Sequence, residues 1–312
     1  MPMPIATLTL NPAVDVTYEI ERLIRDQKAH ADATRFDPGG NGINVGRALK
    51  RLDVTASNVC LLAGETGQFL ERLLGQHIDD PVYVWVDGET RINATILESE
   101  TATQYEVSGI GPQFPQTILD SLRQRFVGRV GNGYGVVTGS VPPGVSEDVY
   151  ATFIHPIRAA GGRPVLDAHG ALLRRGIEAK PFLIKPNLYE LELITGRKLT
   201  DIRAVATEAQ RIRRSGVDHV CVSLGKEGAL LTGTEGTYHA IPPKVKVRSS
   251  VGAGDSMVGG LVAGFAREDA LDDILRLAVA CSVGTVGQPG TELFDPEDLQ
   301  ELSEQIEIRV ID

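Results

Sequence analysis

The sequence predicts an α/β fold with a mostly parallel central sheet and a small β appendage. In the C-terminal two thirds of the 312 residues, short apolar segments alternate with helical stretches. Before them, short segments of alternating hydrophobicity are separated by turn residues. Hydrophobic residues make up 42% of the chain but aromatic residues only 5%, which suits strands buried beneath helices. Strand–helix alternation at this spacing indicates βαβ units, in which the strands run parallel.

The N-terminal part predicts one strand, one helix and an antiparallel ribbon. The first strand covers 5–10, and a helix covers about 43–52, where apolar residues recur at helical spacing. We expect a β appendage built from about 14–36 and 82–110. The alternating segments that predict it lie at 16–20, 29–36, 82–86, 91–98 and 104–107.

The rest of the chain predicts the βαβ body. Buried strands are expected at 136–140, 164–168, 182–187 and 219–225. Helices are expected at about 147–160, 188–195, 201–215, 255–266 and 270–287, with a hairpin at 228–241. The sequence contains no internal repeat or linker, so we expect residues 1–312 to form one domain.

Charge and cysteine content exclude several classes of protein. Forty-one acidic and 31 basic residues give a net charge of −10, which argues against nucleic-acid binding because phosphate neutralisation needs a basic surface. The three cysteines are far apart and show no zinc-binding spacing. The N-terminus lacks a signal-peptide pattern, and no apolar run reaches the ~18 residues of a membrane span. We therefore expect a cytoplasmic protein that binds neither nucleic acid nor membrane.

The first of three candidate ligand loops is PGGNGINVGR at 38–47, directly before the first predicted helix. Glycines at 39, 40 and 42 leave backbone N–H groups exposed and let a ligand come close. A plain turn rarely needs three glycines together, so we favour a ligand-binding loop.

The second loop, SSVGAGDSMVGG at 249–260, is the most informative stretch. Gly252, Ala253 and Gly254 lead into a helix, and three free amides at a helix N-terminus make an anion hole. Asp255 follows, where a general base for phosphoryl transfer would sit beside the anion. A dinucleotide-binding motif is excluded because the third glycine of G-x-G-x-x-G is absent, and no Walker A motif is present.

The third element, KPNLYE at 185–190, follows a buried strand. Lys185 and Asn187 are expected to project from the carboxyl end of the sheet, where open α/β sheets bind ligands. Asn187 and Glu190 could provide oxygen ligands for Mg²⁺, directly or through its waters. Taken alone, this spacing is better explained as a helix cap with a surface acid.

Together these motifs closely resemble the ribokinase-like PfkB family of carbohydrate kinases, nearly end to end. GGNGIN and SSVGAGDSMVGG resemble its two signatures, and Asn187-Leu188-Tyr189-Glu190 resembles its N-x-x-E element. LNPAVD, GETRIN and TGSVPPGV are similar to its phosphosugar branch, the phosphofructokinases and tagatose-6-phosphate kinases. The resemblance implies a three-layer sandwich with a β-sheet lid over the sugar site, and a homodimer in which the lids of two subunits pair.

The resemblance also implies a role for each matching residue. Asp255 matches the general base that takes the sugar hydroxyl proton, with Gly252, Ala253 and Gly254 as the anion hole. A carboxylate with an ordinary pKa of about 4 can serve, because phosphoryl transfer depends more on positioning than on base strength. Residues at substrate-binding positions are Asp15, Lys28, Gly39, Gly40, Asn44, Arg91, Asn93 and Ser140.

The resemblance further implies ATP and Mg²⁺ as cofactors. Residues at ATP-binding positions are Lys185, Asn187, Ser223, Gly225, Gly228, Gly284 and Gln288. Asn187 and Glu190 match the Mg²⁺ element and would hold the ion through water. Potassium is a further expected ion, held by backbone oxygens of the loop 249–251 and the region of Gly290.

Several substrates remain open. Two residues favour 6-phosphofructokinase. Position 41 is Asn, whereas fructose-1-phosphate and tagatose-6-phosphate kinases typically have Lys there. Lys28 matches a lid lysine of the fructose-6-phosphate branch. GETRIN, LNPA and the acidic Glu106 favour 1-phosphofructokinase instead. We expect 6-phosphofructokinase first, with 1-phosphofructokinase or tagatose-6-phosphate kinase as alternatives.

Two further classes of function stay open beside the kinases. One is a catalytically silent sugar-phosphate sensor on the same fold, against which the candidate base Asp255 argues. The other is an NAD-dependent oxidoreductase, which would bind a nicotinamide cofactor.

Overall fold

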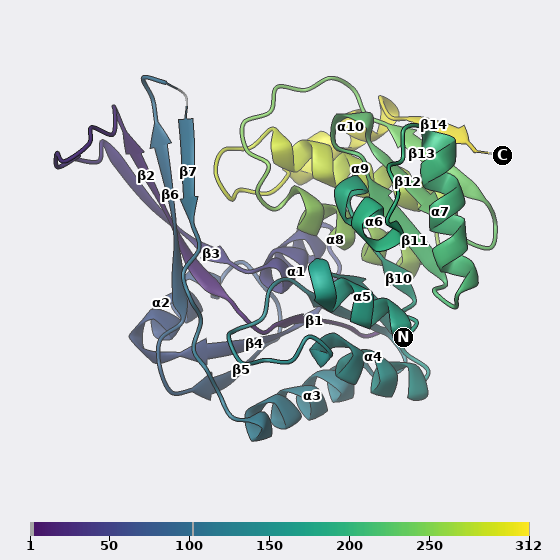
Figure 1. Ribbon diagram of the computed structural model, residues 1–312, viewed down its shortest axis with the longest axis horizontal. Helices are drawn as coiled ribbons and strands as arrows, with labels where there is room; N and C mark the ends of the chain where they lie inside the picture. Colours follow the sequence, from purple (N-terminus) through teal and green to yellow (C-terminus); the bar gives the residue numbers. More distant parts are fainter. Residues whose placement is uncertain (1–2, 102, 312) are drawn as a thin grey trace.

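The computed structural model describes residues 3–101 and 103–311, and it contains two β-sheets with helices around the larger one (Figure 1). The ten strands of the central sheet have the order β14-β13-β12-β11-β10-β9-β8-β1-β4-β5. Their bounds are β1 Ile5–Thr9, β4 Ser57–Ala63, β5 Pro81–Val86, β8 Tyr134–Thr138, β9 Arg163–Asp167, β10 Leu183–Ile184, β11 His219–Ser223, β12 Ala229–Thr232, β13 Thr237–Ile241 and β14 Glu307–Val310.

The strands from β5 to β11 pair in parallel, and those from β11 to β14 pair antiparallel. Every residue of β1 and β8 is buried, as expected for parallel strands covered on both faces. The expected α/β class, with a mostly parallel central sheet and a small separate sheet, is therefore confirmed. Parallel strands also bring their carboxyl ends, and the loops that follow them, to one edge of the sheet.

Helices cover both faces of the central sheet, and two large apolar cores lie between. One core contains α1, α8 and α9, and the other contains α3, α4, α5, α6 and α7. The helix bounds are α1 Asn41–Arg51, α2 Gly64–Leu74, α3 Gln116–Val130, α4 Val149–Ala159, α5 Gly170–Glu178, α6 Leu188–Thr195, α7 Ile202–Arg214, α8 Ala253–Arg267, α9 Leu271–Val286 and α10 Leu299–Glu304.

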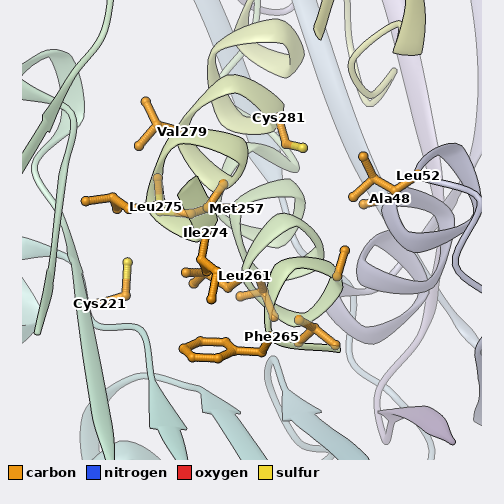
Figure 2. Packing of buried hydrophobic residues seen from close by; sticks show 14 of the residues in the cluster. Ala48, Leu52, Cys221, Met257, Leu261, Phe265, Ile274, Leu275, Val279 and Cys281 are labelled. Atoms are coloured by element: carbon orange, nitrogen blue, oxygen red, sulfur yellow. The ribbon is translucent and has the colours of Figure 1, made fainter. Parts of the chain in front are cut away.

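Helices α8 and α9 pack closely because α8 carries glycines on the shared face. A Cβ atom at Gly260 would lie 2.7 Å from the Ala278 backbone, and one at Gly264 would lie 2.9 Å from the Ile274 side chain. Figure 2 shows Met257, Leu261 and Phe265 of α8 among the apolar side chains of this core. This packing fixes the N-terminus of α8, which begins at the second glycine-rich loop.

The smaller sheet, called the lid below, stands apart from the central sheet (Figure 1). Its order is β3-β2-β6-β7, with bounds β2 Ala13–Ile20, β3 Ala33–Gly39, β6 Arg91–Glu98 and β7 Thr103–Val107. Asp15 lies opposite Asp37 on β3 and Asn93 on β6, so the three share one face. The opposite face is apolar, with Val16 beside Phe36.

The expected boundaries of the lid are wrong at one segment. Residues 82–86 were expected in the lid, but they form β5, which pairs in parallel with β4 at the edge of the central sheet. Val84 is the one buried residue of β5, and the alternation of valine with Tyr83 and Trp85 along the strand resembles the sequence of a lid strand. Five further elements were not predicted from the sequence: α2, α3, α5, β4 and β14. Among the described residues, no helix is long and apolar enough to cross a membrane.

Candidate active site

Asp255 lies in the first turn of α8 and is 5% exposed. Its Oδ1 accepts a hydrogen bond from Asn41 Nδ2 and its Oδ2 accepts one from Asn44 Nδ2, both at 2.8 Å. Burial, helped by the Asp167 charge and opposed by the two amides and Lys185, raises the pKa of Asp255 to about 6. The expected ordinary pKa of about 4 is therefore wrong, because the carboxyl group is almost fully desolvated.

The loop before Asp255 has the geometry of an anion site. Gly252 is the N-cap of α8 with φ 77°, where a Cβ atom would also lie 2.9 Å from Leu293. Residues 252–254 are half-buried, and of their backbone N–H groups that of Ala253 donates to the Ser250 carbonyl at 3.4 Å. A Cβ atom at Gly254 would lie 3.4 Å from Lys185 Nζ, which places an ammonium group beside the helix N-terminus. Helix dipole and ammonium both favour an anion here.

Lys185 follows β10 and is 5% exposed. Its Nζ lies 3.2 Å from Asp167 Oδ1, at the end of the neighbouring strand β9. Burial lowers the pKa of Lys185, but the Asp167 carboxylate outweighs burial and raises the pKa above its usual value, so the ammonium stays charged. Sequence reasoning missed Asp167, although an acid at the carboxyl end of a buried strand was a usable signal.

Asn187 and Glu190 form a capping box at the start of α6. Asn187 Oδ1 accepts a hydrogen bond from the Glu190 N–H, and Glu190 Oε2 accepts one from the Asn187 N–H, both at 2.8 Å. The helix-cap explanation of this spacing is thus correct. Among the described residues there is no group of three or more His, Cys, Asp or Glu side chains that could hold a metal. These residues therefore fit only an Mg²⁺ ion that keeps most of its waters or phosphate ligands.

The polar face of the lid carries several of the expected sugar ligands. Asp15 accepts a hydrogen bond from Asn93 Nδ2 at 2.7 Å, and burial raises the pKa of Asp15 to about 6. A Cβ atom at Gly39 would overlap the Asp15 carboxyl group, so only glycine fits there. Gly40, the N-cap of α1, has φ 126°. Asn41, two residues beyond Gly39, reaches Asp255, and both carboxyl groups therefore border the same loop.

Arg91 and Ser140 are joined by a residue that the sequence did not single out. Arg91 Nε donates to the Asn11 carbonyl at 3.1 Å, and Asn11 Nδ2 donates to Ser140 Oγ at 3.1 Å. Asn11 Oδ1 is buried without a hydrogen-bond partner among the described residues. Asn11 lies in the LNPA segment, which was noted only for its resemblance. These side chains connect the lid to the loop after β8.

Lys28 is not brought to this site within one chain. It is exposed in the loop 21–32, which joins the distal ends of β2 and β3. Asp15 lies near the opposite end of β2. It is five residues before Ile20, the last residue of the strand, so about 16 Å of strand separates Asp15 from the start of this loop.

The residues expected to bind ATP fall into two groups. Ser223 pairs with Asn187 in an isolated parallel bridge, which places it beside the capping box, and Gly225 follows it, exposed. Gln288 is half-buried just beyond the end of α9. The other two glycines are buried: a Cβ atom at Gly228 would overlap the Ala240 carbonyl, and one at Gly284 would lie 2.7 Å from Phe294 Cβ. Packing alone requires glycine at these two positions.

Comparison with known proteins identifies the family of this chain. The profile of the pfkB family carbohydrate kinases matches residues 7–298. The 1-phosphofructokinase of Haemophilus influenzae is 34% identical, covering 99% of both chains, and that of Bacillus subtilis is 33% identical, covering 96% of this chain and 98% of its own. The solved structure of Escherichia coli phosphofructokinase-2 in complex with potassium has a TM-score of 0.92 at 32% identity, covering 97% of this chain and 99% of that one.

The family match, the curated relatives and the solved structure cover nearly the whole chain. The relatives are sugar-phosphate kinases, and the site holds a buried carboxylate in the first turn of α8. The chain therefore belongs to the pfkB family of carbohydrate kinases, and it is a phosphotransferase of the phosphofructokinase type that acts on an alcohol group of a sugar phosphate.

Proposed function

We propose that this kinase transfers the γ-phosphoryl group of ATP to the 6-hydroxyl of fructose 1-phosphate, giving fructose 1,6-bisphosphate and ADP. The observation that carries the proposal is the buried Asp255 carboxylate between two amide donors, at the helix N-terminus beside Lys185. Phosphoryl transfer depends mainly on positioning and on stabilising the charge of the transferring group. A fixed acceptor base next to a positive site for an anion supplies both.

In the proposed reaction, Asp15 and Asn93 hold the sugar hydroxyls and Asp255 takes the proton from the attacking hydroxyl. Two hydrogen bonds leave part of the four lone-pair sites of a carboxylate free, so a hydroxyl can bind Asp255 without displacing an amide. Asn41 is exposed whereas Asn44 is buried, so the sugar approaches from the Asn41 side. The oxygen attacks the γ-phosphorus, ADP leaves, and the amides after Gly252 receive the phosphoryl oxygens.

Three cofactors belong to the proposal. ATP would lie along Lys185, Asn187, Ser223, Gly225 and Gln288. Mg²⁺, held near Asn187 and Glu190 through water, would neutralise phosphate charge. Potassium would bind near the loop 249–251, and activity with K⁺ against Na⁺ tests it.

Fructose 1-phosphate replaces fructose 6-phosphate as the first candidate because the comparisons favour it. The relatives at 33–34% identity are 1-phosphofructokinases. Lys28, which favoured fructose 6-phosphate, lies at the far end of the lid within one chain. Asn41 donates to Asp255, so its identity is explained without a substrate phosphate. Fructose 6-phosphate stays the second candidate, since one structural neighbour, at 30% identity and TM-score 0.89, is phosphofructokinase-2 in complex with fructose-6-phosphate.

Coupled ATP turnover with Mg²⁺ and K⁺ tests the choice by comparing kcat/KM for fructose 1-phosphate, fructose 6-phosphate and tagatose 6-phosphate. A clear lead for fructose 1-phosphate supports the proposal, and a lead for either of the others refutes it. If none of the three sugar phosphates is turned over, a catalytically silent sugar-phosphate sensor becomes the favoured alternative.

We also propose that two lids pair in a homodimer. The lid face opposite Asp15 is apolar and exposed, with Tyr105 43% and Val107 63% accessible. A hollow of about 280 Å³ beside this face is lined by Tyr18, Ile20, Leu23, Ala29, Ala31 and Ile96. Large exposed apolar patches mark protein interfaces. One structural neighbour is a tetrameric inhibited form of E. coli phosphofructokinase-2, so the stoichiometry must be measured.

Light scattering after gel filtration tests the dimer. Val107→Asp should reduce the mass to that of a monomer. Val310→Asp is the matched control, because Val310 is similarly exposed but lies on β14, an outer strand of the central sheet and not of the lid. A dimer that survives Val107→Asp would contradict pairing through this face.

A further inference from the structure

Three arginines from the lid side of the molecule hold the segment 289–294, which follows α9. Arg35 lies on β3, whereas Arg47 and Arg51 lie on α1. Together they donate to the carbonyls of Pro289 (Arg35, 3.4 Å), Thr291 (Arg47, 3.3 Å), and Leu293 and Phe294 (Arg51, both 2.5 Å). Glu292 in the same segment pairs with Arg51 and lies 4.0 Å from Arg47.

Arg47 differs from the other two because it also reaches the base. Its Nη1 donates to Asn44 Oδ1 at 3.2 Å, across one turn of α1. Asn44 Nδ2 in turn donates to Asp255 Oδ2 at 2.8 Å. A continuous chain of hydrogen bonds therefore runs from the Thr291 carbonyl through Arg47 and Asn44 to the carboxylate of Asp255.

This chain permits only one orientation of the Asn44 amide. A guanidinium group can only donate hydrogen bonds, and a carboxylate can only accept them. Asn44 must therefore turn its oxygen toward Arg47 and its NH₂ group toward Asp255. With the amide reversed, Asn44 Oδ1 would face the carboxylate oxygen and Nδ2 would face the guanidinium, so both contacts would be repulsive.

The burial of Arg47 is costly. It is 3% exposed, its Nε has no hydrogen-bond partner among the described residues, and its only close carboxylate, on Glu292, is 4.0 Å away. A buried charge with incomplete pairing destabilises a protein, and an apolar side chain of similar size is often more stable there. Packing of α1 alone does not explain an arginine at this position.

We propose that Arg47 is a positioning residue, which fixes the Asn44 amide in the orientation that donates to Asp255 and links the base to the segment 289–294. The inference deepens the proposed function, since it rests on Asp255 being the base. Arg51 holds the same segment but has no hydrogen bond to Asn44, so it serves as the matched control.

The quantity to measure is the acidic limb of the pH profile, the pH range in which kcat falls as Asp255 becomes protonated. Asp255 is surrounded by the amides of Asn41 and Asn44, the Lys185 ammonium and the Asp167 carboxylate. Without Arg47, the Asn44 amide can turn, and the charged form of Asp255 loses a donor. The limb should then move to higher pH by about one unit, since the charged form of Asp255 loses part of one hydrogen bond that favours it over the protonated form.

The experiment compares Arg47→Gln with Arg51→Gln at saturating substrates between pH 5 and 9. Arg47→Gln removes the fixed donor and should move the limb by about one unit, which reduces kcat about 2-fold at pH 7 and about 10-fold at pH 5. Arg51→Gln should lower the thermal midpoint but leave the limb in place. Arg47→Lys, which keeps a donor-only charge, should restore most of the wild-type limb. An unshifted limb in Arg47→Gln, or an equal shift in Arg51→Gln, overturns the proposal.

Two additions keep the outcomes separate. Arg47→Met carries the same expected shift and replaces Arg47→Gln if that variant does not fold. Asp255→Asn, measured alongside, tests the base itself: near-wild-type turnover there refutes the proposed function, whereas loss of turnover there with an unshifted limb in Arg47→Gln refutes only the role of Arg47.

Discussion

Asp255→Asn separates the catalytic role of this carboxylate from its cost in stability. The amide has nearly the same shape but cannot take a proton, so kcat should fall by roughly 10²–10⁴ while ATP binding is nearly unchanged. At neutral pH, however, removing the charge of Asp255 should favour the folded state of the variant over that of the wild type. Burial keeps the pKa of Asp255 at about 6 against the ordinary value of 3.8, so the folded state disfavours the ionised carboxylate.

The sign follows from where the proton is bound. Below pH 3.8 Asp255 is protonated in both the folded and the unfolded chain, and it costs nothing. Above pH 6 it is ionised in both states, and the cost is complete, about 3 kcal/mol at about 1.4 kcal/mol per pKa unit. At pH 4.5 the same two pKa values leave a cost of about 1 kcal/mol. The stability of Asp255→Asn relative to wild type should therefore rise by about 2 kcal/mol between pH 4.5 and 7.

Urea denaturation at both pH values measures this difference. An amide at position 255 also points one NH₂ group at Asn41 or Asn44, which costs about 1–3 kcal/mol at every pH and lowers both values together. Asp15, whose pKa is also raised to about 6, contributes equally to both proteins and cancels. A relative stability that stays flat from pH 4.5 to 7 would refute the conclusion that Asp255 is buried and half-protonated near pH 6.

Three further predictions concern the sugar site. The kcat of the wild-type enzyme should fall as the pH drops below about 6, because Asp255 must be ionised to accept a proton; a profile flat to pH 5 would contradict this. Arg91→Ala should raise the KM for the sugar phosphate at least 10-fold with a smaller change in kcat, because we expect Arg91 to contact the phosphate of the sugar, which does not react. Gly39→Ala should weaken sugar binding without affecting ATP binding by calorimetry, since its Cβ would displace the Asp15 carboxyl group; unchanged sugar affinity would place the sugar elsewhere.

Local motifs predicted which residues lie together around Asp255. The anion hole and Asp255 are neighbours in one short stretch, and Gly39 to Asn44 form another, so their spacing was visible in the sequence. The raised pKa of Asp255 was not visible in the sequence, because the burial that causes it depends on side chains from distant elements. Asn11 was missed because its partners lie 80 or more residues away along the chain, and Arg47 because its burial depends on the distant segment around Thr291, although Asn44 is only three residues away. The edge strand β5 was assigned to the wrong sheet because its alternation of valine with aromatic residues resembles that of a lid strand.

The alternating faces of the lid make its strands sensitive to insertion and deletion. Along β6, Asn93 lies on the same face as Asp15, where we propose that the sugar binds, whereas Ile92 faces away. Because side chains alternate with a period of two, a one-residue deletion ahead of β6 that shifted its register would exchange the two faces. The sugar would then meet a row of apolar side chains, and the outer surface would become polar. Sugar recognition and the apolar outer surface would thus be lost together, so a change in length between β5 and β6 is far more damaging than any single substitution on the outer face.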